Sequence, residues 1–134
     1  MNKHCYEETT RDIRIAVEPE FLSDHSEPEE NRYLWSYSIS IENKGSETVQ
    51  LLTRHWRITD SRGRVREVKG DGVVGEQPVI KPGGKFQYSS GAPLETPSGF
   101  MGGSYRMRTE RGEFFDAGIP TFALDSPFEV RRVH

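Results

Sequence analysis

Cysteine is almost absent from this chain, and the shortage excludes several kinds of site. Cys5 is the only cysteine among 134 residues, so the sequence supplies neither an internal disulfide nor a zinc site built on cysteine. The four histidines, His4, His25, His55 and His134, stand far apart, with no His-x-His or His-x-x-x-His pair. We therefore expect no metal site and no cofactor.

Long apolar segments are missing as well. Hydrophobic residues make up 33% of the chain and the mean hydropathy is -0.74. No run of residues has the length of a signal-peptide core or of a membrane-spanning helix. Together with the shortage of cysteine, this predicts a cytoplasmic protein with no membrane partner. The net charge of -3 argues against nucleic acid as a partner, because a nucleic-acid-binding domain needs a basic face.

What is present alternates with the period of half-buried strands. The clearest case is residues 33–41, where Tyr33, Trp35, Tyr37, Ile39 and Ile41 share one parity and serines occupy much of the other. Aromatic and β-branched residues in this pattern indicate a strand with one buried face. Similar segments recur along the chain, separated by turns rich in its 13 glycines and 8 prolines.

No segment shows three turns of helical apolar spacing, so helices contribute little to the expected fold. We predict one all-β domain over residues 1–134, with residues 1–11 flexible. Its expected architecture is an immunoglobulin-like or fibronectin type III-like antiparallel β-sandwich of about seven strands. Such a two-layer arrangement suits a chain of modest hydrophobic content, because each strand needs only one apolar face.

A glycine-rich segment, residues 70–78, interrupts the strand pattern. Its Gly70-x-Gly72-x-x-Gly75 spacing matches the dinucleotide-binding fingerprint. That fingerprint functions where the loop opens a helix, whose N-terminus holds the pyrophosphate. Pro78 and Pro82 follow here and leave no room for the helix. We therefore predict that the glycines supply positive φ or close backbone approach in a bulge or wide turn.

The same segment also has features of a binding site. Arg66 and Lys69 precede it, and the amides of a glycine-rich turn can form an anion-binding nest. Asp71 and Glu76 oppose anion binding, because they place negative charge inside the loop. The candidate binding residues are Gly70, Asp71, Gly72, Val73, Val74, Gly75, Glu76, Gln77 and Pro78, together with Arg54, Trp56, Arg66 and Lys69.

No catalytic constellation is visible in the sequence. The serines at 89–90 and 98 lack the Gly-x-Ser-x-Gly elbow of a nucleophile, and no pair of carboxylates stands out. We therefore expect no catalytic residue and no enzymatic activity. The acidic segment 24–30 contains carboxylates that can hold a hard cation weakly, but a solvated loop is the expected structure. Arg54 shares a strand parity with Trp56, which predicts cation–π packing on a sheet face.

Several segments together resemble the bacterial ApaG family, also named CorD. The resemblance rests on residues 49–60, 70–78, 88–91 and 96–105, and extends from about Ile13 to the C-terminus. It implies a fibronectin type III-like sandwich with no established enzymatic activity. The resemblance also implies links to cobalt and magnesium tolerance and to diadenosine tetraphosphate metabolism. Related domains in eukaryotic proteins are thought to mediate protein contacts.

Two functional hypotheses follow from these observations. The first is a non-catalytic module that binds another protein through residues 70–78 and the adjoining strand from Arg54 to Trp56. The alternative is a sensor that binds a nucleotide or polyphosphate through the backbone amides of residues 70–75. The sequence does not identify a protein partner, and it does not predict an oligomeric state.

Overall fold

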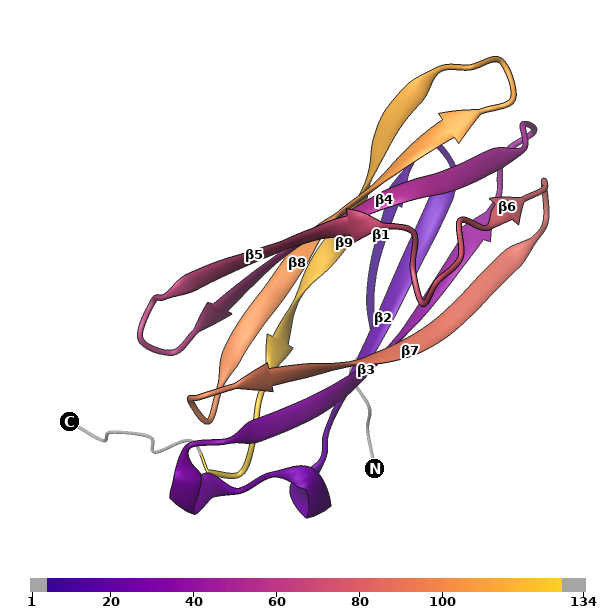
Figure 1. The fold of residues 1–134 in the computed structure, drawn as a ribbon. Coiled ribbons are helices and arrows are strands. Elements are labelled where there is room, and N and C mark those ends of the chain that lie inside the picture. The colour runs from indigo at the N-terminus through magenta and orange to yellow at the C-terminus, as the bar shows by residue number, and fades with distance from the viewer. Residues whose placement is uncertain (1–4, 129–134) are drawn as a thin grey trace.

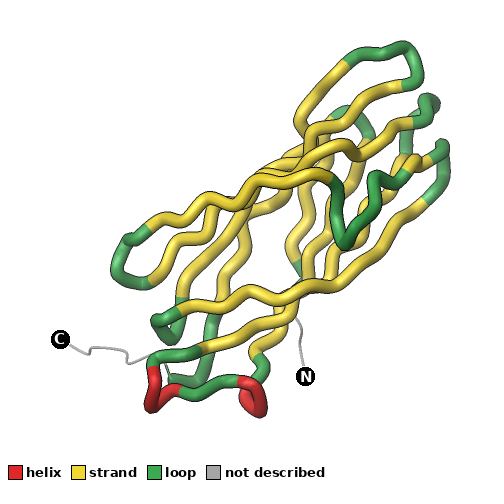
Figure 2. The backbone as a smooth tube through the Cα atoms, viewed as in Figure 1, coloured by secondary structure: helices red, strands yellow, loops and turns green. Residues whose placement is uncertain are grey.

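The computed structural model describes residues 5–128, and its regular structure is almost entirely antiparallel strands (Figure 1). Figure 2 shows helical turns only in the segment that links the second and third strands. In chain order the elements are β1 (Tyr6–Thr10), β2 (Ile13–Phe21), the 3-10 turns η1 (Ser23–His25) and η2 (Pro28–Glu30), β3 (Tyr33–Asn43), β4 (Val49–Asp60), β5 (Val65–Asp71), β6 (Val79–Ile80), β7 (Lys85–Leu94), β8 (Gly99–Thr109) and β9 (Phe114–Leu124).

The strands form two sheets, which confirms the predicted all-β sandwich. One sheet has the order β1-β2-β3-β7, and the other has the order β5-β4-β8-β9, with β6 pairing to β4. The described residues contain nine strands rather than about seven. β6, one of the extra strands, is only two residues long. The other is β1, in a segment expected to be flexible. It pairs with β2 from Tyr6 opposite Val17 to Thr10 opposite Ile13, whereas residues 1–4 lie outside the described part of the chain.

The core lies between the two sheets and is built on aromatic rings. The alternating residues of β3 are buried as predicted, with Trp35 1% and Tyr37 6% exposed. Trp56 of β4 makes edge-on contacts with Tyr37, Tyr105 and Phe122. Aromatic pairs in this geometry contribute about 0.5–1.5 kcal/mol each beyond their buried area. Rings from both sheets therefore fix the sheets face to face.

The two sides of the sandwich differ. On one side β1 lies beside β9, where the Gly118 amide donates to the Thr10 hydroxyl at 3.2 Å. On the other side β5 and β7 are the terminal strands of their sheets, and the Arg66 side chain of β5 approaches the Pro93 carbonyl of β7 at 3.5 Å. Free strand edges and the glycine-rich segment therefore lie on this second side.

Candidate functional site

The glycine loop (residues 70–78) begins at the end of β5 and folds into a tight two-residue turn. The Val73 amide donates to the Glu76 carbonyl at 2.8 Å, and the Glu76 amide donates back at 2.9 Å. Both central residues have positive φ, 43° at Val74 and 80° at Gly75, as a type I′ turn requires. The segment thus opens no helix. It forms a tight turn instead of the predicted bulge or wide turn.

Two glycines of this loop lie in close contacts, and one of them also has a positive φ. Gly72 has a φ of 62°, and a Cβ there would overlap the carbonyl oxygen of Glu76. At Gly70, a Cβ would lie 2.8 Å from the guanidinium of Arg54, which covers this position. The prediction that the glycines supply positive φ or close approach is confirmed at both places.

Arg54 fastens the loop to the neighbouring strand β4. Its Nη1 donates to the carbonyl oxygens of Asp71 at 2.9 Å and of Gly72 at 2.8 Å. The Gln77 side-chain amide adds a bond to the Leu52 carbonyl at 2.9 Å, and the Gly72 amide reaches the same oxygen at 2.8 Å. Hydrogen bonds that involve a charged group contribute about 1.5–3 kcal/mol each. The loop is therefore held against β4 at both of its ends.

Three tyrosines lie close to Arg54 between the sheets. The hydroxyls of Tyr88 and Tyr105 are hydrogen-bonded to each other. Burial raises the pKa of Tyr37, Tyr88 and Tyr105, and the positive charge of Arg54 opposes part of that rise. These phenols consequently stay neutral at physiological pH, and they serve as a packed polar layer behind the loop.

The remaining predicted residues do not gather at one place. Trp56 is 3% exposed, so it cannot reach a partner from the core. Arg54 and Trp56 do share a face, as their parity predicted, but it is the inner face, and Arg54 turns to the loop carbonyls. Arg66 reaches across to β7, where it approaches the Pro93 carbonyl at 3.5 Å. Lys69 lies exposed on β5.

The anion-nest hypothesis depends on free amides, and several amides of the loop are engaged. Those of Gly72, Val73 and Glu76 donate to backbone carbonyls. The Arg54 charge that faces the loop is likewise directed at carbonyl oxygens. Binding of a nucleotide or polyphosphate here stays a prediction, and it rests on the amides at the turn's tip.

The tip of the turn presents an apolar side chain to solvent. Val74 is 56% exposed and holds a φ of 43°. Positive φ in a β-branched residue is a genuine outlier that costs of order 1–3 kcal/mol. Such strain persists only where the surrounding structure imposes it, and it clusters at sites that contact ligands or partners. Val74 is therefore the residue of the loop whose strained and exposed conformation most suggests a binding role.

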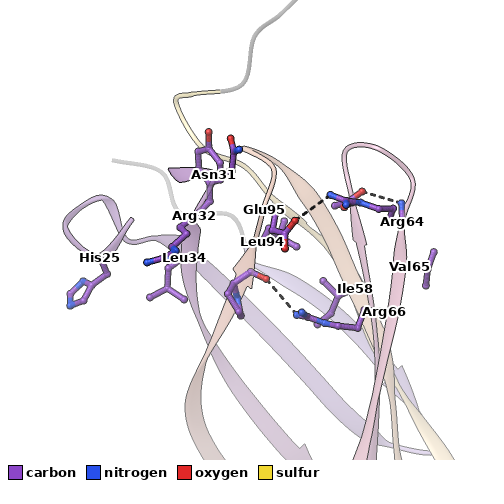
Figure 3. Close-up of a pocket in the computed structure, with 13 residues that line it drawn as sticks. His25, Asn31, Arg32, Leu34, Ile58, Arg64, Val65, Arg66, Leu94 and Glu95 are labelled. Atoms are coloured by element: carbon purple, nitrogen blue, oxygen red, sulfur yellow. Dashed lines mark hydrogen bonds and ion pairs between the residues drawn. The ribbon is translucent and has the colours of Figure 1, made fainter. Parts of the chain in front are cut away.

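A second surface feature was not predicted from the sequence. An open cavity of about 530 Å³ lies between the ends of β5 and β7, beside the 3-10 turns. We call it the arginine groove, because Arg32, Arg64 and Arg66 line it (Figure 3). Its lining comes from chain segments scattered between His25 and Glu95, so no single stretch of sequence could have revealed it.

Carboxylates already balance much of the charge in the arginine groove. Arg64 donates to Asp60 at 2.7 Å and lies 3.8 Å from Glu95 (Figure 3). Burial alone would raise the pKa of Asp60, but hydrogen bonds from Arg64 and Arg62 outweigh it and lower that pKa. The groove therefore combines an apolar wall with paired charges, and nothing in it marks a strong anion site.

The described residues also bear on metal sites and on membrane-spanning helices. Residues 5–128 contain no group of three or more histidine, cysteine or acidic side chains placed to hold a metal ion. The acidic segment 24–30 forms the exposed turns η1 and η2. In the same part of the chain, no helix is long and apolar enough to span a membrane.

Comparison with known proteins agrees with this geometry. The sequence model of the ApaG domain matches residues 23–109. Protein ApaG of Rhodospirillum centenum is 62% identical over 122 residues, which cover 91% of this chain and 94% of that protein. Protein ApaG of Paramagnetospirillum magneticum is 57% identical over 129 residues, covering 96% and 99%. The crystal structure of the putative ApaA protein from Bordetella pertussis superposes with a TM-score of 0.83 at 40% identity, over 92% of this chain and 98% of that one. The chain belongs to the ApaG family.

Proposed function

We propose that this protein is a non-catalytic module that binds another protein through its glycine loop. The observation that carries the proposal is Val74, an exposed β-branched residue held at positive φ at the tip of the turn. Apolar side chains that are fixed in advance bind with little loss of conformational entropy. Val74 would act as the anchor that enters an apolar pocket of the partner.

The structure behind the loop supports this role. Arg54 and Gln77 tie the loop to β4, and Gly70 lets the Arg54 guanidinium lie flat against the backbone. A loop fixed in this way presents one shape, which is the arrangement found where a rigid scaffold carries a recognition loop. Arg54 and Trp56 would thus support the recognition surface from behind, while residues 72–78 contact the partner.

The family resemblance implies links to cobalt and magnesium tolerance and to diadenosine tetraphosphate metabolism, and under this proposal such links would be indirect effects. The described residues include no cluster suited to a metal ion. We therefore expect these effects to run through the bound protein. A variant that loses the partner should also lose its influence on tolerance, with no change in metal binding by the purified chain.

The test compares two valines of similar exposure. Val74→Asp places a charge at the anchor, whereas Val65→Asp does the same on β5, where the valine is 51% exposed. Partners captured by the wild-type protein should be retained by Val65→Asp and lost by Val74→Asp. Removing an interface anchor costs 2 kcal/mol or more, so affinity for the purified partner should fall about thirtyfold. Retention of every partner by a folded Val74→Asp protein would reject the proposal.

A further inference from the structure

One edge of the sandwich is open and regular enough to pair with another strand. The Asp60 amide donates to the Arg64 carbonyl, and the Gly72 amide to the Leu52 carbonyl. The even-numbered residues of this part of the chain therefore point their backbone groups toward β4. In an antiparallel ladder the alternate residues point the other way, so Val65, Glu67 and Lys69 direct their N–H and C=O groups to the free side of β5.

The other edges are less available. On β7, the Asn43 amide donates to the Gly84 carbonyl, so even-numbered residues face β3 and Pro93 is among those that face outward. Proline has no N–H to offer a further strand, and Arg66 approaches its carbonyl oxygen. β9 lies against β1, where Gly118 donates to Thr10. Among the long strands of residues 5–128, β5 is thus the edge that remains open.

We propose that a second copy of this chain pairs with β5 through its own β5, antiparallel and around a two-fold axis at Val68. Two-fold contacts of this kind are isologous, so one strand must be complementary to itself. Backbone direction requires outward residues to face outward residues, which leaves few registers. In the register centred on Val68, Glu67 of each copy faces Lys69 of the other.

The charges of the β5 side chains favour this register over the two adjacent registers. Moving the axis to Lys69 would place two lysines directly opposite each other and Glu67 opposite Asp71, and moving it to Glu67 would oppose two glutamates. Opposite charges across a strand pair contribute about 0.2–1 kcal/mol, and like charges cost a similar amount. On the same face, Arg57 lies 3.8 Å from Glu67, so Glu67 would stand between cations of both copies.

The inner face of the strand fits the same arrangement. Val68 is partly buried against the core, and it would meet its counterpart on the axis, at the position where side chains of an antiparallel pair approach most closely. The Asp71 carbonyl already accepts from Arg54, so the central Glu67 and Lys69 pairs carry the contact. This inference does not depend on the proposed function, because residues 72–78 lie outside the pairing.

Charge reversal with the purified full-length protein tests the proposal. Sedimentation equilibrium from micromolar to millimolar concentration should show a concentration-dependent dimer. Glu67→Lys and Lys69→Glu should each weaken the dimer by about tenfold or more, because each creates two like-charge pairs. An equimolar mixture of the two variants should associate again, since one chain then carries lysine and the other glutamate at both positions. Lys85→Glu on β7 is the matched control and should leave the dimer unchanged.

Amide exchange gives a second readout on the same samples. The amides of Glu67 and Lys69 should exchange more slowly as the dimer forms, whereas those of even-numbered residues of β5 are protected in the monomer as well. A wild-type protein that stays monomeric at millimolar concentration would overturn the proposal. So would a dimer that both charge reversals leave intact.

Discussion

Two alanine substitutions in one turn separate the demands of backbone geometry from those of packing. Gly72 and Gly75 both have positive φ, 62° and 80°, so alanine at either place costs about 1–2 kcal/mol for the left-handed conformation. A Cβ at Gly75 meets nothing within 4 Å, whereas a Cβ at Gly72 overlaps the Glu76 carbonyl oxygen. That oxygen accepts the Val73 amide, so relief of the overlap breaks the turn's own hydrogen bond.

The expected losses of unfolding free energy therefore differ. Gly75→Ala should lose about 1 kcal/mol, and Gly72→Ala about 3 kcal/mol, since the broken bond and the displaced carbonyl add to the dihedral cost. Urea denaturation followed by tryptophan fluorescence measures both, because Trp35 and Trp56 are buried. Equal losses in the two variants, with unchanged amide exchange at Val73 and Glu76, would refute the reasoning about Gly72.

Three further predictions use the groups around the loop. Arg54→Met removes the bonds to the Asp71 and Gly72 carbonyls. It should destabilise the protein by about 2 kcal/mol and speed amide exchange in the loop, as hydrogen-exchange measurements would show. Asn43 is 1% exposed and donates to the carbonyls of Glu47 and Ile80, so Asn43→Ala should cost about 2–4 kcal/mol in urea denaturation. Burial raises the pKa of Tyr88 and Tyr105 in the folded state. The contribution of this shift to stability is therefore complete below about pH 10 and is lost as the pH rises through the raised pKa values. Absorbance titration of tyrosinate, recorded alongside alkaline unfolding, should show ionisation and unfolding together.

An amide NMR titration with diadenosine tetraphosphate, ATP and pyrophosphate, with and without magnesium, tests the nucleotide hypothesis. The amides of Gly72, Val73 and Glu76 are already bonded to backbone carbonyls, so we expect no saturable shifts confined to residues 69–78. Saturable shifts there at micromolar ligand would instead establish a phosphate nest and replace the protein-binding proposal for this loop.

Most of the fold could be predicted from the strand periodicity of the sequence. β3 was predicted correctly because every second residue from Tyr33 to Ile41 is apolar and all of these residues are buried. β1 was missed for the opposite reason, since its five residues are mostly exposed and their sequence contains no apolar alternation. Such a strand is stabilised by its ladder with β2, a contact that local sequence cannot show.

The backbone geometry of the glycine loop could be predicted from the sequence, whereas the side chains that contact the loop could not. The glycine spacing and the prolines after it were enough to exclude a helix and to predict backbone geometry that needs glycine. They could not show that Arg54 would cover Gly70, because that contact depends on the register of β4 with β5. Parity placed Arg54 and Trp56 on one face, but only the packing of the second sheet decides that this face is the buried one.

The most direct test of the account is site-specific photo-cross-linking from the glycine loop. A photoreactive residue in place of Glu76 leaves Val74 intact, and the same residue at Arg108, exposed on β8, is the control. We predict that position 76 cross-links one discrete protein in cells, that position 108 does not, and that adding Val74→Asp abolishes the product. Equal cross-linking from both positions, or a product at 76 that survives Val74→Asp, would contradict the claim that this loop is the recognition surface.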